Sequence, residues 1–190
     1  MRSDADGTVM AAKPERDSVD RFRKLWRKEL PDVDTSPMET VGRINRFARF
    51  AHESISATFA EFGIDRGEFD VISTLRRSGP PYRLTPTALY QLLMLTSGGV
   101  THRLQRLEKR GLIVREPSPD DGRVMTAGLT RKGYELVEAS FREDMKREQK
   151  LLAPLNARER RELGNLLRKL LMQYEAPPDT AGVSRDPDPR

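Results

Sequence analysis

The apolar residues of this chain change their spacing once, at Gly111, and that change limits the folds available to it. Before Gly111, Val100, Leu104 and Leu107 recur at the spacing of a helix that buries one face. After it, the segments LIVRE and RVMTA flank the turn sequence PSPDDG, a pattern that predicts a β-hairpin. This hairpin is the only strand signal in the sequence, so we expect a mostly α protein with a small β-hairpin.

Helical patterns lie on both sides of the hairpin. Ser18 is expected to cap a short accessory helix over residues 18–30, which stops at the Leu30-Pro31 step. Ser36 and Glu39 have the spacing of a capping box and open a long helix over residues 37–62 that ends before Gly63. Further helix N-caps are expected at Asp65, Thr85, Thr130 and Asn156.

Two of the predicted helices are short and are joined by the tight turn LTSG at residues 95–98. Short helices joined in this way are typical of a helix-turn-helix, and the hairpin follows them where a wing would lie. We therefore expect a winged helix-turn-helix over about residues 65–129. The helices at residues 37–62 and 130–175 carry apolar stripes that so small a domain cannot fully bury alone, which predicts that they dimerise.

The second helix of this motif has two different faces. Its polar, cationic face suits the major groove of double-stranded DNA, where side chains meet base edges and phosphates. The expected DNA contacts are Thr96, Ser97, Gly98, Thr101, His102, Gln105, Arg106 and Lys109, with Asp121 orienting Arg123 of the wing in the minor groove. The alternative is an amphipathic surface helix with a solvated charged face, as in a helical protein-interaction module.

Composition narrows the classes of function. A net charge of +5 and a sequence pI of about 9.7 favour polyanionic partners, although modest basicity also keeps proteins soluble. The absence of cysteine excludes disulfides and thiol redox sensing. His52 and His102 are the only histidines and have no acidic residues at metal-binding spacing, so we expect neither a metal nor a cofactor. Without a phosphate-binding loop or a nucleophile elbow, an enzyme is not expected.

The two ends of the sequence are poor in apolar residues. Residues 1–17 and 176–190 are rich in Pro, Asp, Gly, Arg and Ser, and we expect both segments to be disordered. The start lacks the apolar core of a signal peptide, and no apolar stretch approaches the roughly 20 residues of a membrane span. The cytoplasm is the expected location, with no membrane partner.

The segment TSGGVTHRLQRLEKRGLIVREPSPDDGRVMTAGLTRKG resembles the recognition helix and DD-x-R wing of MarR regulators. The resemblance spans roughly residues 37–175. It implies a homodimer joined through N- and C-terminal helices, and a repressor whose operator binding is weakened by a small ligand. The wing departs from the commoner pattern at Gly122, where Arg or Lys is frequent, so its hold on phosphate is expected to be weaker.

Four further residues resemble the PecS-like, urate-responsive branch of this family. They are Trp26, Asp70, Arg103 and Arg115, in the order of that branch's accessory helix, second helix and recognition region. The resemblance implies a site for a small anionic ligand such as urate, which arginines would neutralise and a carboxylate and an indole would orient. The alternative is a structural ion-pair cluster of Asp70 with the two arginines beside a packed Trp26. The four residues indicate the site better than they indicate the ligand.

Overall fold

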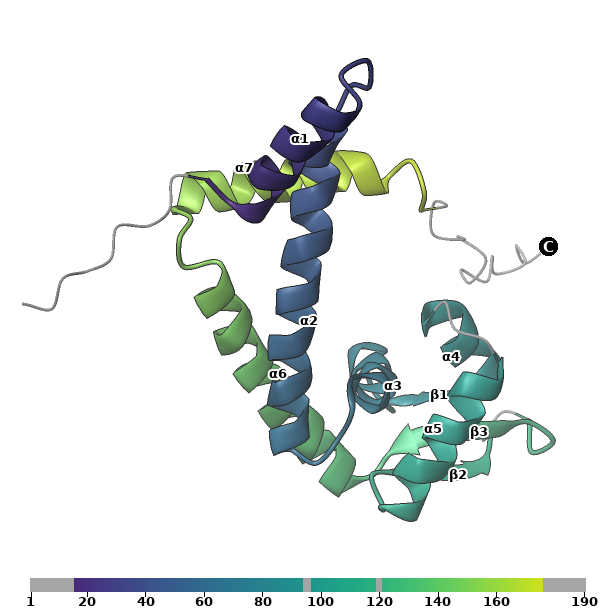
Figure 1. Ribbon diagram of the computed structural model, residues 1–190. Helices are drawn as coiled ribbons and strands as arrows, with labels where there is room; N and C mark the ends of the chain where they lie inside the picture. The colour runs from purple at the N-terminus through teal and green to yellow at the C-terminus, as the bar shows by residue number, and fades with distance from the viewer. Residues whose placement is uncertain (1–15, 94–96, 119–120, 176–190) are drawn as a thin grey trace, which may run out of the picture. The chain divides into compact units, whose positions relative to one another are not determined.

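The computed structural model describes residues 16–93, 97–118 and 121–175 (Figure 1). The chain divides into two compact units, Met1–Ala57 and Thr58–Arg190. Both segments predicted to be disordered lie wholly or almost wholly outside the described residues. Within those ranges, no helix is both long enough and apolar enough to cross a membrane.

The first unit contains α1 (Ser18–Glu29), the π-helical turn η1 (Met38–Gly42) and most of α2 (Arg43–Glu61). The predicted cap at Ser18 is wrong by one residue: Asp17 is the N-cap, because Asp20 lies at the position that completes a capping box with it. The cap predicted at Ser36 is also wrong, since the helix begins after Pro37 without a side-chain cap. Glu39 instead pairs with the buried Arg23.

Arg23 joins α1 to the segment that follows it and to η1. It is 7% exposed, its Nε donates a hydrogen bond of 3.0 Å to the carbonyl of Thr35, and its guanidinium pairs with Glu39. A buried guanidinium needs such partners, because an unpaired charge is costly to remove from water. Arg43 adds ion pairs to Asp17 (2.7 Å) and Asp20 (2.8 Å), so polar contacts join the start of α1 to the start of α2.

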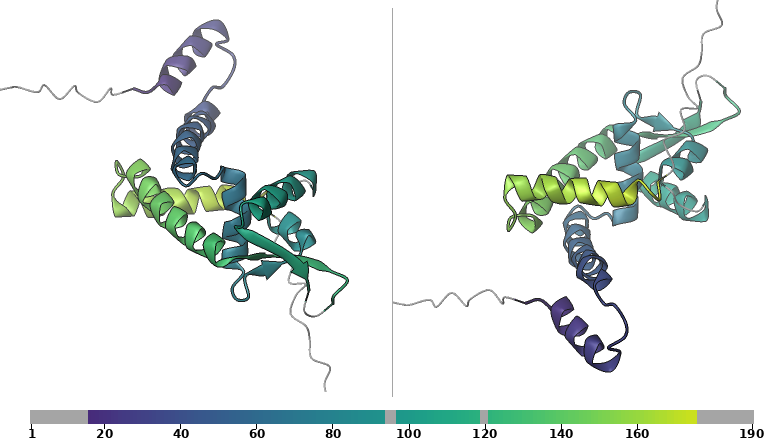
Figure 2. Two further views of the ribbon diagram at one scale, coloured as in Figure 1. Left: turned by 90° about the horizontal axis from the view of Figure 1, so that it is seen from below. Right: turned by 90° about the horizontal axis from the view of Figure 1, so that it is seen from above.

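The second unit has the order of a winged helix-turn-helix. Its elements are α3 (Arg66–Arg77), β1 (Arg83–Leu84), α4 (Pro86–Leu93), α5 (Ser97–Lys109), β2 (Ile113–Pro117), β3 (Met125–Leu129), α6 (Arg131–Leu151) and α7 (Ala157–Leu171). The predicted hairpin is confirmed: β2 and β3 run side by side and antiparallel, with Arg115 opposite Ala127 (Figure 2). The short strand β1, which pairs with β3 through Arg83 and Gly128, was not predicted because two residues give no periodic signal.

Several predicted helix boundaries are confirmed. Asp65 and Glu68 form a capping box at the start of α3, Asn156 and Glu159 form one at the start of α7, and Thr130 caps α6. Gly63 ends the preceding helix with a positive φ of 70°, a conformation that glycine adopts without steric cost.

The core of the second unit lies between α3, α4, α5 and the sheet. Its fully buried side chains come from all of these elements and from α6: Val71, Ile72, Leu75, Leu89, Val100, Leu107, Leu112, Ile113 and Val137. Each fully buried aliphatic side chain contributes about 1.5–3 kcal/mol through removal of apolar surface from water. The recognition helix candidate, α5, is therefore fixed by its apolar face to the rest of the unit.

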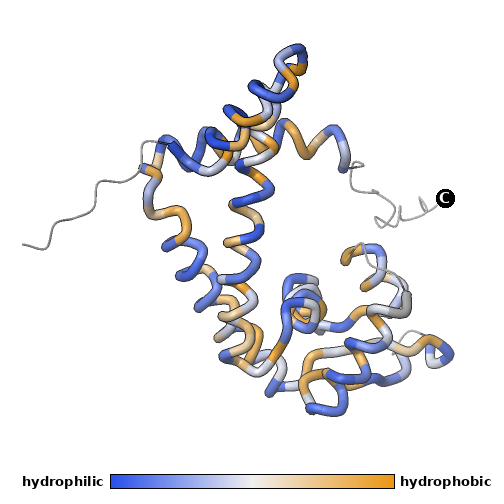
Figure 3. The backbone as a smooth tube through the Cα atoms, viewed as in Figure 1, coloured by the Kyte–Doolittle hydropathy of each residue, from blue (hydrophilic) through white to orange (hydrophobic). Residues whose placement is uncertain are grey.

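Apolar residues recur among hydrophilic ones along α1, α2 and α7 (Figure 3), and several of them are exposed. They include Phe22, Leu25 and Trp26 of α1, Val41, Ile44, Phe47 and Phe50 of α2, and Leu163, Leu166, Leu170 and Leu171 of α7. In the described part of the chain, each of these side chains keeps at least 37% of its surface exposed.

Candidate functional site

The two faces of α5 are separated as the periodicity predicts. Val100, Leu104 and Leu107 are at most 2% exposed and pack into the core. Thr101, His102, Gln105 and Lys109 are exposed on the opposite side. Ser97 and Gly98 form the first turn of α5. Thr96, which was predicted as a contact, lies outside the described residues.

A side chain of α4 contacts this polar face of α5. The hydroxyls of Tyr90 and Thr101 lie 3.2 Å apart and share a hydrogen bond. The polar face of α5 is thus fixed relative to α4 by a side-chain contact as well as by the core below it.

Arg106 differs from the other residues of the predicted interface. Its guanidinium forms ion pairs of 3.0 Å with Asp65 and 3.1 Å with Glu68, although 46% of its side chain is exposed. Arg110 approaches the same Glu68 at 3.3 Å. The helical wheel placed Arg106 on the polar face, but it could not show that the first turn of α3 offers two carboxylates there.

In the described part of the wing, Asp121 makes a local contact with the backbone. The carboxylate of Asp121 accepts a hydrogen bond of 3.0 Å from the backbone N–H of Arg123. Asp121 therefore fixes the backbone of Arg123, and the Arg123 guanidinium forms no ion pair with another described residue. Both residues are exposed, as a side chain that reaches a groove must be.

Two of the predicted ligand-site residues meet at the start of α3. The Arg103 guanidinium lies over Gly67, so close that a Cβ there would be 2.7 Å from Cζ of Arg103. Asp70 follows on the same helix, where partial burial raises the pKa of its carboxyl group, opposed by the positive charges of Arg66, Arg103 and Arg77. The Asp70 and Arg103 side chains form no direct ion pair, so that part of the predicted ion-pair cluster is wrong.

Arg115 does not join this pair. Its guanidinium binds Glu108 at 2.7 Å, because the Gly111 turn brings the end of α5 against β2 and makes this local partner available. The predicted cluster of Asp70, Arg103 and Arg115 is therefore not a single ion-pair network. Trp26 belongs to the first unit, on α1, where 50% of its surface is exposed.

A groove of roughly 860 Å³ runs between α3 and α6, and sequence reasoning missed it. Asp70, Arg77 and Lys146 contribute charge to its wall, whereas Phe69, Val137, Phe141 and Met145 give it apolar surface. Only the fold brings these two helices together, although the positions of the residues along each helix could have shown which of them share a face.

Arg76, in the last turn of α3, also lines this groove. Its guanidinium lies 5.0 Å from the ring centroid of Tyr82 and 4.6 Å from that of Tyr134, and it pairs with Glu138 at 2.7 Å. The hydrogen bond from Arg76 lowers the pKa of the Glu138 carboxyl group, so the pair stays ionised at neutral pH. These contacts join the end of α3 to α6.

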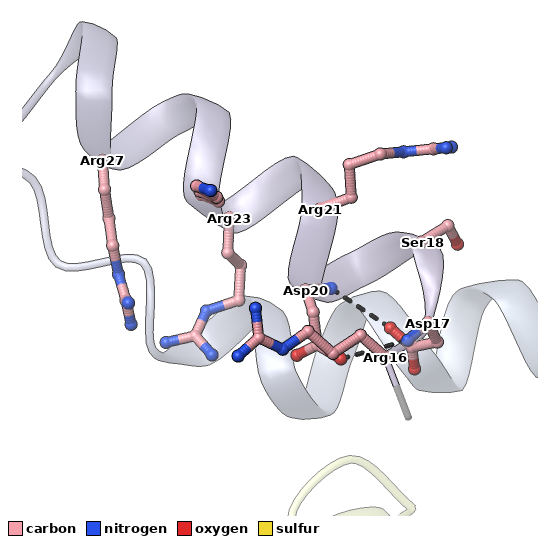
Figure 4. A pocket seen from close by; sticks show the side chains of 8 residues that line it. Arg16, Asp17, Ser18, Asp20, Arg21, Arg23 and Arg27 are labelled. Atoms are coloured by element: carbon pink, nitrogen blue, oxygen red, sulfur yellow. Dashed lines mark hydrogen bonds between the residues drawn. The ribbon is translucent and has the colours of Figure 1, made fainter. Parts of the chain in front are cut away.

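The first unit has a charged hollow of its own along α1 (Figure 4). Arg16, Arg21, Lys24 and Arg27 line it with Asp17 and Asp20, whose carboxylates are already bonded to the helix N-terminus and to Arg43. A single helix and the two residues before it supply the whole lining, as expected of a solvated helix surface. Over the described ranges, no three acidic or histidine side chains are grouped to hold a metal ion.

Comparison with known proteins agrees with this architecture. A model of the MarR family matches residues 62–124, which include α3, α4, α5 and β2. The transcriptional regulator PecS of Dickeya dadantii is 33% identical over 142 residues, which are 75% of this chain and 86% of PecS. The predicted resemblance to the PecS-like branch is thereby confirmed.

Solved structures show the same fold. A MarR mutant from E. coli, complexed with operator DNA, superposes with a TM-score of 0.61 at 26% identity, over 77% of this chain and 98% of that one. Sco3205 from Streptomyces coelicolor, a MarR family regulator crystallised with DNA, has a TM-score of 0.65 at 22% identity, over 76% of this chain and 91% of that one. The chain therefore belongs to the MarR family of winged helix-turn-helix transcriptional regulators, in its PecS-like branch, and is not an enzyme.

Proposed function

We propose that this protein binds double-stranded operator DNA as a homodimer and represses transcription until a small anionic ligand releases it. The observation that carries the proposal is the separation of faces on α5, whose apolar side is buried while Thr101, His102, Gln105 and Lys109 are exposed. A helix held by one face and polar on the other suits the major groove. The adjacent wing presents Arg123 for the minor groove.

The proposed contacts divide into two kinds. Thr101, His102 and Gln105 have donors and acceptors that can read base edges, whereas Lys109 attracts phosphate. Arg106 is shared between DNA and the carboxylates of α3. The MarR structure solved with operator DNA supports this assignment by analogy, since its chain superposes on this one over most of its length.

Homodimerisation is proposed from the exposed apolar residues of α1, α2 and α7. Leu166 and Leu171 of α7 are 57% and 52% exposed, and Phe47 and Phe50 of α2 are 47% and 49% exposed. Apolar surface repeated along helices in this way favours association with a second copy. Size-exclusion chromatography with light scattering should give twice the mass of the chain, and a monomer at micromolar concentration would contradict the proposal.

For the ligand, we propose an anionic purine, with urate as the compound to test first. Support comes from Asp70, half-buried among the charges of Arg66, Arg103 and Arg77. The guanidinium of Arg103, unpaired with Asp70, can turn toward an anion. Arg115 would contribute by exchanging Glu108 for the ligand, and Trp26 is included in the proposal through the resemblance to the PecS-like branch. The site is expected to work in the cytoplasm, where such metabolites meet a regulator.

DNA binding can be tested on a duplex selected by the purified protein from a random library. Gln105→Ala should relax selectivity at one base position, whereas Lys109→Ala should weaken binding to all sequences alike and flatten its salt dependence. If the protein selects no duplex, the alternative of a helical protein-interaction module is favoured. If both variants bind like the wild type, the contacts are misassigned.

Ligand binding can be followed through the emission of Trp26, the only tryptophan. Urate is titrated with xanthine and salicylate as controls, and the signal is corrected for light absorbed by the ligand. We expect saturable quenching by urate that is lost in Asp70→Ala and in Arg103→Ala. Quenching that persists in both variants would show that urate binds at a site without Asp70 and Arg103. No response to any ligand would leave a regulator without an effector at these residues.

A further inference from the structure

Three arginines, two in α5 and one directly after it, contact the start of α3. Arg103 lies over Gly67, Arg106 pairs with Asp65 and Glu68, and Arg110 pairs with Glu68. They are spaced three and four residues apart and so lie along one side of the helix. This side runs between the buried apolar face and the face that carries Gln105 and Lys109, and Arg106 borders the latter.

Glu68 is the centre of these contacts. Its side chain is 0% exposed, yet Arg106 and Arg110, which cover it, are 46% and 35% exposed. One carboxylate oxygen accepts hydrogen bonds from the backbone N–H of Asp65 at 3.0 Å and from Arg110 at 3.3 Å. The other oxygen forms the 3.1 Å ion pair with Arg106 without a well-directed hydrogen bond. The residue therefore does more than cap α3, because it is the buried counter-ion of Arg106 on the recognition helix and of Arg110 directly after it.

We infer that Glu68 is a positioning residue for sequence recognition, a role that rests on the proposed binding of operator DNA by α5. The apolar face of α5 seats the helix in the core, and any rotation about the helix axis that the core still allows would move the flank that carries the three arginines. Ion pairs on one flank oppose such rotation directly. Since successive residues point about 100° apart, a small rotation changes which side chains meet the bases.

The same arrangement predicts opposite effects of Glu68 on two quantities: the preference for one duplex sequence over another, and the affinity for duplex DNA of any sequence. Glu68 places a negative charge beneath two arginines that face solvent, so its removal makes the surface more attractive to phosphate. The isosteric Glu68→Gln variant keeps an acceptor for the backbone N–H of Asp65, because glutamine also closes capping boxes. We therefore expect this variant to bind a scrambled duplex at least as well as the wild type. Its preference for the selected duplex should fall about tenfold, the usual size of coupling lost with a close charge pair.

The matched control is Glu159→Gln in α7. Glu159 is also a capping-box glutamate, bonded to the backbone N–H of Asn156 at 2.7 Å, but it is exposed and pairs with no arginine of the described chain. Fluorescence anisotropy on selected and scrambled duplexes gives the ratio of the two dissociation constants for each protein, and circular dichroism gives the folded fraction. The control should keep the wild-type ratio.

Three results would overturn the inference. Glu68→Gln could keep the wild-type ratio, it could lose affinity for both duplexes equally while folded, or the control could lose the ratio as much. If Glu68→Gln does not fold, Arg110→Gln tests the same contact from its exposed end and should also lower the ratio. A wild-type protein that prefers no duplex would overturn the proposed function itself, whereas a selective wild type with an equally selective Arg110→Gln would overturn only the role of Glu68.

Discussion

Gly133, in the first turn of α6, lies where the backbone of Leu112 leaves no room for a side chain. A Cβ at Gly133 would be 2.9 Å from the carbonyl carbon of Leu112 and closer still to its oxygen. That oxygen accepts hydrogen bonds of 3.1 Å from both the backbone N–H and the hydroxyl of Thr130, the N-cap of α6. Replacing Gly133 by alanine must therefore push α6 away from the joint between α5 and β2.

The expected cost follows from these contacts. Overpacking against a buried site costs about 1–3 kcal/mol, and each hydrogen bond that is stretched costs about 1 kcal/mol. Alanine offsets about 1 kcal/mol of this loss, because its helix propensity is higher than that of glycine. For Gly133→Ala we thus expect a net loss of about 2–4 kcal/mol in the free energy of unfolding, within the range of damaging single substitutions.

Urea denaturation followed by circular dichroism measures this loss. The protein concentration must be held constant, because association makes the apparent stability depend on it. Gly164→Ala in α7 is the matched control, since a Cβ there meets no atom within 4 Å. It should be neutral or stabilise by up to about 1 kcal/mol. A loss below about 0.5 kcal/mol for Gly133→Ala would refute the steric reasoning.

Three further predictions concern the second unit. Burial raises the pKa of the Asp70 carboxyl group, so the free energy of unfolding should fall as pH rises above the ordinary value of 3.8 and this group ionises. Asp70→Asn should remove this fall between pH 4 and pH 7, as measured by urea titration at the two pH values. An unchanged pH profile in the variant would contradict the prediction. Leu107→Ala, at a side chain with 0% exposure, should cost about 2–5 kcal/mol by calorimetry, and a smaller loss would mean that the core collapses around it. Gly67→Ala should displace the guanidinium of Arg103 and so weaken the quenching of Trp26 emission by urate, while the free energy of unfolding changes by less than about 1 kcal/mol. Normal quenching in this variant would mean that the ligand binds elsewhere.

Local signals in the sequence predict much of this fold. The buried face of α5 follows from the spacing of Val100, Leu104 and Leu107, because periodicity alone decides which side chains a helix can bury together. The capping box of Asp65 and Glu68 follows from their three-residue spacing, which lets each carboxylate accept a hydrogen bond from the other residue's backbone N–H. Asp17 and Asp20 have this spacing as well, and it could have corrected the cap predicted at Ser18.

Contacts between elements are harder to predict. The pairing of Arg106 with Asp65 and Glu68 depends on the angle at which α5 crosses α3, which no local pattern encodes. Arg115 has Glu108 only seven residues away, but the two meet because Gly111 turns the chain back. The resemblance to a ligand-responsive branch indicated which residues to examine, and their charge partners became visible only in three dimensions.

We propose that the exposed face of α5 and the wing form the DNA surface. This proposal is tested most directly by anisotropy titrations of a selected duplex at several salt concentrations, with wild type and with the double variant Lys109→Ala, Arg123→Ala. Because each cationic side chain that docks on DNA, at a phosphate or in the minor groove, releases about one counterion, the slope of log affinity against log salt should be steep for the wild type and shallower by about two for the variant. Equal slopes and equal affinities would show that the protein binds DNA through another surface.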